Sequence, residues 1–128
     1  MRRAKLQWII FLAVHLALLA PPLHAQNQQT VTPDEALRHH GQSITVCGKI
    51  AGTQYAAKLK GKPTLLHLGK SYPEHLFTIV IWESDRGKFE KPPEELFWNK
   101  EVCVSGLIVE HNGKPQIVVK NPSQISIR

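Results

Sequence analysis

A run of lysines around one tyrosine is the part of this sequence whose residue types most readily suggest chemistry. Lys58, Lys60 and Lys62 occupy alternate positions, Tyr55 precedes them, and no acidic residue occurs within residues 49–70. Ammonium groups neutralise phosphates, and an aromatic ring can stack an unpaired base. The segment therefore has residue types suited to single-stranded nucleic acid or another polyanion. The alternative is that the lysines are simply solvated in an exposed loop.

Two further rings could extend this surface if they point outward. His67 lies in the apolar stretch 64–69, and Trp82 ends the apolar run 76–82. A tryptophan at the end of an apolar strand more often packs in the core, and aromatic residues make up only 7% of the chain, which limits a stacking surface. The predicted nucleic-acid-binding residues are Tyr55, Lys58, Lys60, Lys62 and His67.

The histidines and acids do not have the spacing of a metal or catalytic site. The five histidines after residue 25 include no HxH or HxxxH pair, and no carboxylate lies at ligand spacing beside a pair. No Ser-His-Asp or Cys-His arrangement stands out either. We therefore expect no metal ion, no cofactor and no enzymatic activity.

The first 25 residues have the pattern of a secretory signal peptide. Residues 1–5 are basic, residues 6–20 are mostly apolar, and Ala25 precedes a polar segment. The alternative is a retained membrane anchor, but a bilayer span needs about 20 apolar residues. We expect cleavage near Ala25 and export to the periplasm or the medium. Three of the sixteen Lys and Arg residues lie in this segment, so its removal lowers the net charge from +6 to +3.

The remaining chain, about 100 residues long, is enough for one domain with a modest core. Residues 26–31 are polar and predict a disordered linker, and the domain is predicted to span 32–128. At its start, Thr32 and Glu35 predict a short helix with a capping box, which ends at Gly41.

From Ser43 onward, apolar residues recur with a period of two, which indicates β-strands. Five strands are predicted over 44–52, 64–69, 76–82, 102–109 and 115–121. The run 76–82 is apolar throughout, as expected for a strand buried on both faces. Pro92 and Pro93 predict a short helix between the third and fourth strands, and Asn112-Gly113 predicts a two-residue hairpin turn.

This order predicts an all-β fold with small helices, namely a five-stranded OB-fold barrel with a helix between strands three and four. An SH3-like barrel is the main alternative, but it does not normally have a helix at that position. The predicted core side chains are Val46, Ile50, Leu66, Leu68, Ile79, Ile81, Val102, Val104, Leu107, Ile117 and Val119.

Five stretches carry a family resemblance: VCGKI, PTLLHLGKSYPEHLFTIVIW, DRGKF, VCVSGLI and GKPQIVVKNPSQI. They resemble small exported bacterial OB-fold proteins and the OB-fold domains found beside nuclease domains in secreted bacterial enzymes. The resemblance covers about residues 33–127 and implies a nucleic-acid-binding type of module. In OB folds, the loop between strands one and two and the exposed face of strands two and three form the usual ligand groove.

The resemblance also bears on catalysis and on the cysteines. Secreted thermonucleases share the barrel but need clustered acids and arginines, and here Arg86 has no second arginine nearby. In the implied barrel, strands one and four are antiparallel neighbours. Cys47 and Cys103 stand among polar residues on those strands, so both face outward and can form a disulfide in an oxidising compartment. The alternative is two free thiols.

The sequence thus predicts an exported, non-catalytic, monomeric OB-fold module that binds single-stranded nucleic acid or another polyanion, with no membrane association after signal cleavage. The main alternative is a periplasmic structural or protein-interaction module with an envelope protein partner and no nucleic-acid binding. Oligosaccharide binding is a third reading, which the shortage of aromatic residues disfavours.

Overall fold

The computed structural model describes residues 29–128, so the expected signal peptide over residues 1–25 lies outside the described residues. The strands are β1 (Thr30–Val31), β2 (Ser43–Tyr55), β3 (Thr64–Leu68), β4 (Phe77–Ile81), β5 (Glu101–Leu107), β6 (Val109–His111), β7 (Lys114–Val118) and β8 (Ile125–Ile127). The helices are the 3₁₀ helices η1 (Pro33–His39) and η2 (Pro122–Gln124) and the short α-helices α1 (Glu83–Arg86) and α2 (Pro93–Leu96).

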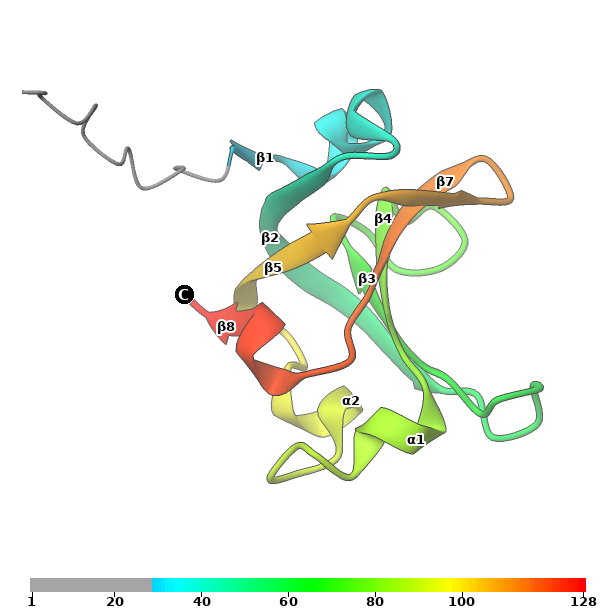
Figure 1. The fold of residues 1–128 in the computed structure, drawn as a ribbon. Coiled ribbons are helices and arrows are strands. Elements are labelled where there is room, and N and C mark those ends of the chain that lie inside the picture. Colours follow the sequence, from blue (N-terminus) through cyan, green and yellow to red (C-terminus); the bar gives the residue numbers. More distant parts are fainter. Residues whose placement is uncertain (1–28) are drawn as a thin grey trace, which may run out of the picture.

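The strands form one sheet that closes into a barrel around the core (Figure 1). Strands β2, β3 and β4 pair as an antiparallel meander, and β4 pairs with β7 in parallel. Strand β6 pairs with β7, β5 pairs with β2, and only Ile108 separates β5 from β6, so the sheet returns to its start. The predicted all-β barrel is confirmed, and α2 lies between β4 and β5 at the position expected for the helix; α1, in the same connection, was not predicted.

The core confirms the predicted strand faces except at one position. Ten predicted core side chains are fully buried, but Leu107 is 50% exposed and Ile108 is buried in its place. The predicted set departs from the period of two after Val104, whereas in the structure that period continues unbroken through Gly106, where an added Cβ would lie 2.8 Å from Cγ2 of the core residue Ile117, to Ile108. There the backbone N–H of Ile108 donates to the carbonyl of Gln42, 2.9 Å away, and the carbonyl of Ile108 accepts from the N–H of Gly41.

The N-terminal part of the domain differs in detail from the prediction. Thr30 and Val31, expected in a linker, form β1 and pair in parallel with β2, because Val31 is apolar and buries its side chain in the core. The expected helix is a 3₁₀ helix, and Thr32 makes no side-chain cap. Gly48 in the middle of β2 gives this helix room, because a Cβ there would lie 2.7 Å from Cγ of Pro33.

A disulfide joins the two cysteines, as the sequence predicted. Cys47 and Cys103 are directly opposite in the β2–β5 register, and their sulfurs are 2.06 Å apart. The neighbouring pair on the same outer face, Thr45 and Ser105, shares a hydrogen bond of 2.7 Å between hydroxyl oxygens. Within residues 29–128, no helix has the length and apolar composition needed to cross a bilayer.

Candidate functional site

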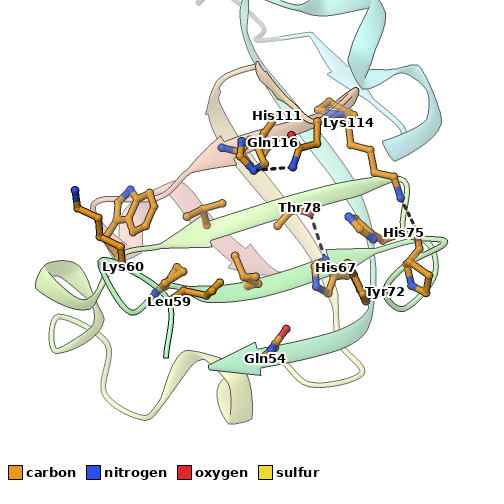
Figure 2. Close-up of a pocket in the computed structure, with 17 residues that line it drawn as sticks. Gln54, Leu59, Lys60, His67, Tyr72, His75, Thr78, His111, Lys114 and Gln116 are labelled. Atoms are coloured by element: carbon orange, nitrogen blue, oxygen red, sulfur yellow. Dashed lines mark hydrogen bonds between the residues drawn. The ribbon is translucent and has the colours of Figure 1, made fainter. Parts of the chain in front are cut away.

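A groove of about 710 Å³ lies on the outer side of the barrel, over β3, β4 and β7 (Figure 2). The loop between β2 and β3 borders one end of it with Leu59, Lys60 and Pro63. The turn between β3 and β4 and the β6–β7 hairpin border the rest. In an OB fold, ligands bind on the face of the second and third barrel strands. Those strands are β3 and β4 here, so the groove occupies that face.

The floor of the groove consists of the outward-facing residues of strands that also line the core. Leu65 and His67 come from β3, and Thr78 and Val80 come from β4. They alternate with core residues along each strand, because successive side chains point to opposite faces of a sheet. Every residue of β4 is buried, which confirms the expected strand covered on both faces. Two of these four floor residues, Leu65 and Val80, are apolar.

The charges around the groove have one sign. Lys60 and Lys114 line it, and Figure 2 shows Lys60 at one end and Lys114 near the other. The Lys114 ammonium donates a hydrogen bond to the carbonyl of Pro73, which holds it at the rim. Among the residues that the structure describes, no aspartate or glutamate lines the groove. The site therefore favours an anionic ligand, or one with anionic groups at its ends.

Exposed aromatic rings stand at both ends of the groove. Trp82 is 38% exposed and rests on Gly61, where an added Cβ would lie 2.9 Å from the indole Cε3. At the other end Tyr72 is 70% exposed and stacks on His75, with ring centroids 5.6 Å apart and an interplanar angle of 23°. Each end thus combines a flat ring with a lysine.

One buried and one half-buried imidazole, those of His67 and His75, lie beside Tyr72. His67 is 4% exposed, its Nδ1 lies 3.3 Å from Oγ1 of Thr78, and its ring centroid is 4.3 Å from that of His75. Burial, with smaller contributions from His75 and Lys114, lowers the pKa of His67 to about 4. Burial and then Lys114 also lower the pKa of His75. The uncharged form of both rings is therefore favoured at neutral pH.

The structure places two of the five sequence-predicted site residues in the groove. Lys60 and His67 line it, whereas Lys58 and Lys62 are exposed in the same loop outside it. Tyr55 is engaged elsewhere: its hydroxyl donates to Glu83 over 2.6 Å, and this hydrogen bond raises the pKa of Tyr55. The sequence interpretation did not select Tyr72, His75, His111 or Lys114, which line the groove.

Arg86 explains why Tyr55 does not reach the groove. Its guanidinium carbon lies 4.0 Å from the centroid of the Tyr55 ring and covers one face of it. The same guanidinium makes a two-point ion pair with Glu94, one arm of which is 2.7 Å, and donates to the hydroxyl of Thr64 over 2.9 Å. Glu94 raises the pKa of Arg86, and Arg86 lowers that of Glu94. These side chains tie α1 and α2 to the end of the barrel.

Two acidic residues of α1 are likewise held in hydrogen bonds. Asp85 accepts a hydrogen bond of 2.7 Å from Lys88, and Glu83 accepts the one from Tyr55. Within residues 29–128, no group of three His, Cys, Asp or Glu side chains is placed to hold a metal ion.

No protein-family model matches this sequence, and neither does any curated protein. Among solved structures, the chain is similar to the aspartyl-tRNA synthetase of Entamoeba histolytica, with a TM-score of 0.51 and 12% identity over 85% of this chain and 23% of that one. A Leishmania major Friedlin protein assigned as an aspartyl-tRNA synthetase gives a TM-score of 0.49 and 11% identity over 80% and 21%. The OBody AM1L10, solved bound to hen egg-white lysozyme, gives a TM-score of 0.44 and 17% identity over 71% of this chain and 83% of that one. The chain spans less than a quarter of the two synthetases, and the Entamoeba likeness supports the fold.

Proposed function

We propose that this protein is an exported, non-catalytic OB-fold module that binds single-stranded nucleic acid in the groove over β3, β4 and β7. The observation that carries the proposal is the lining of the groove. It combines a lysine and an exposed aromatic ring at each end with no carboxylate among the described residues that line it. Binding of single strands uses this pair of features, because the phosphates need cations and the unpaired bases need flat rings.

The floor favours bases over phosphates as the groups that enter the groove. Leu65 and Val80 are apolar, and the imidazole of His67 is predominantly neutral at physiological pH. A desolvated phosphate would lack a charged partner there, whereas the faces of bases tolerate an apolar surface. The sugar-phosphate backbone of the bound nucleic acid would then run along the rim, where Lys60 and Lys114 lie.

Export and the absence of catalysis are parts of the same proposal. The signal-peptide pattern over residues 1–25 and the Cys47–Cys103 disulfide both suit an oxidising compartment. Three acids of α1 and α2, Glu83, Asp85 and Glu94, are held in contacts with Tyr55, Lys88 and Arg86, away from the groove lining.

The test is the salt dependence of binding to labelled oligonucleotides of about 12 nucleotides. The salt slope is the slope of the logarithm of the binding constant against the logarithm of the salt concentration. For Lys60→Ala and Lys114→Ala we expect weaker binding and a salt slope whose magnitude falls by about 0.7 for each substitution. For Tyr72→Ala and Trp82→Ala we expect a loss of about 1 to 3 kcal/mol with the slope unchanged. Lys58→Ala is the matched control, because this lysine lies in the same loop but outside the groove.

Each outcome decides something. If Lys58→Ala changes the salt slope as much as Lys60→Ala does, the oligonucleotide lies over the loop between β2 and β3 and not along the groove. No binding at low salt by folded protein would refute nucleic-acid recognition and leave the protein-interaction module as the function to pursue.

A further inference from the structure

We propose that the Tyr72 end of the groove reads the edge of one unpaired base through the ring nitrogens of His67 and His75, so that the module prefers some bases over others. This inference rests on the proposed function and adds a specificity that stacking and phosphate contacts do not provide. Stacking tolerates every base because each has a flat face, and lysines on phosphates carry no sequence information.

The first observation is that two polar atoms at this end have no partner. Among the described residues, the buried side-chain nitrogens and oxygens without a hydrogen bond are Nε2 of His67 and Nδ1 of His75. Native proteins pair nearly all such atoms, so each exception calls for an explanation. Both atoms belong to residues that line the groove, and the two ring centroids are only 4.3 Å apart. The orphan nitrogens therefore belong to one small region of the ligand surface.

The second observation is the position of Tyr72 beside both rings. Its centroid lies 6.0 Å from that of His67 and 5.6 Å from that of His75. Tyr72 is 70% exposed while it stacks on His75, so much of its ring remains open for a base to stack on. A base stacked on Tyr72 then has its edge next to the two imidazoles.

A base edge fits these nitrogens better than a phosphate does. Base edges carry uncharged donors and acceptors side by side, as a pair of neutral imidazoles requires. The hydrogen bonds would form at atoms already shielded from water, so a matching edge gains contacts that the free protein lacks. An edge of the wrong polarity would gain no such contacts and would bury its own donors and acceptors without partners, and this difference is the source of discrimination.

The other end of the groove provides no equivalent contact. There the exposed ring is Trp82, and its neighbours Leu59 and Pro63 are apolar. We therefore expect sequence preference at one nucleotide position, with sequence-independent binding at the position next to Trp82.

The experiment compares oligo-dT, oligo-dC and oligo-dA of equal length at neutral pH and fixed salt. Wild-type protein should bind its preferred base at least about fivefold more tightly than its least preferred one. His67→Phe and His75→Phe keep a ring of similar size but remove the nitrogens. Each substitution should lower the ratio of the affinities for the preferred and the least preferred oligonucleotide. In the double variant this ratio should fall to about twofold or less. His40→Phe is the matched control, because this exposed histidine is outside the groove lining, and it should keep the wild-type ratio.

A second measurement does not depend on whether His67→Phe folds. In wild-type protein, the preferred oligonucleotide should shift the ¹⁵N resonances of the His67 and His75 ring nitrogens, and it should leave those of His40 in place. Equal binding of all three oligonucleotides by wild-type protein, or unshifted ring nitrogens at saturation, would overturn base reading while leaving the proposed function standing. Equal weakening of all three by His67→Phe would assign the ring to packing. No binding of any oligonucleotide would instead refute the proposed function itself.

Discussion

The buried imidazole of His67 makes the stability of this domain depend on pH in a way that one substitution should remove. Burial lowers the pKa of His67 to about 4, against an ordinary value of 6.5. The folded protein therefore binds fewer protons than the unfolded chain between these two values. Stability from the neutral ring is fully present above pH 6.5 and is lost as the pH falls toward 4.

The size of the effect follows from the two pKa values. One unit of pKa difference corresponds to about 1.4 kcal/mol, so the free energy of unfolding should fall by about 2 kcal/mol between pH 7 and pH 5 and by about 3 kcal/mol by pH 4. The ring is 4% exposed, so solvent screening reduces this figure little. The groups that face it from neighbouring segments are His75, Lys114 and the uncharged Thr78 and Tyr72.

The assay is urea unfolding of wild-type protein and His67→Phe over this pH range. Other groups also titrate there: the pKa of His75 is lowered by burial, and that of Glu94 by the hydrogen bond from Arg86. These groups remain in the variant, so the difference between the two proteins isolates His67. His40→Phe should retain the wild-type dependence. If the difference between wild type and His67→Phe stays constant across the range, within about 0.5 kcal/mol, the argument from burial is refuted.

Three further outcomes follow from contacts outside the groove. Replacing Cys47 and Cys103 by serine should lower the free energy of unfolding in urea by about 4 kcal/mol, because the bond closes a loop of 56 residues; an unchanged midpoint would contradict this. Arg86→Met should cost about 1 to 3 kcal/mol by leaving Glu94 without its partner, and it should not change oligonucleotide affinity. Gly61→Ala should displace the indole that rests on this glycine at φ +78°, and titration should show weaker binding with an unchanged salt slope.

Local patterns were sufficient to predict most of the fold. The alternation along β2 to β4 assigned core and surface because a strand has a period of two. Asn112 and Gly113 formed the expected turn, with φ of 51° and 78° that suit these residue types. Leu107 was wrong because it departs from this period: Val102, Val104 and Ile108 are buried, so the odd position 107 faces outward.

The site was less predictable because it is assembled by pairing between distant strands. Strand β7 pairs with β4 in parallel, which sets Gln116 opposite Thr78. This register carries Lys114, two residues earlier, to the rim of the groove. Tyr72 and His75 fall in the connection between the predicted strands 64–69 and 76–82, but no local pattern shows which side of the barrel this connection covers. Tyr55 was predicted to bind the ligand because its contact with Arg86 could not be foreseen. The two residues are far apart in sequence and meet only in the folded domain.

The groove also shows why net charge is a poor guide to the ligand of this protein. Without residues 1–25 the net charge is +3, which would argue against strong binding of an anion if the charges were evenly spread. They are not evenly spread: Glu83, Asp85 and Glu94 are paired at the α1–α2 end, whereas no acid among the described residues lines the groove. A strand lying in the groove therefore meets Lys60 and Lys114 with no nearby carboxylate to offset them. The local arrangement of charge, more than its sum, makes this face of the barrel suited to a polyanion.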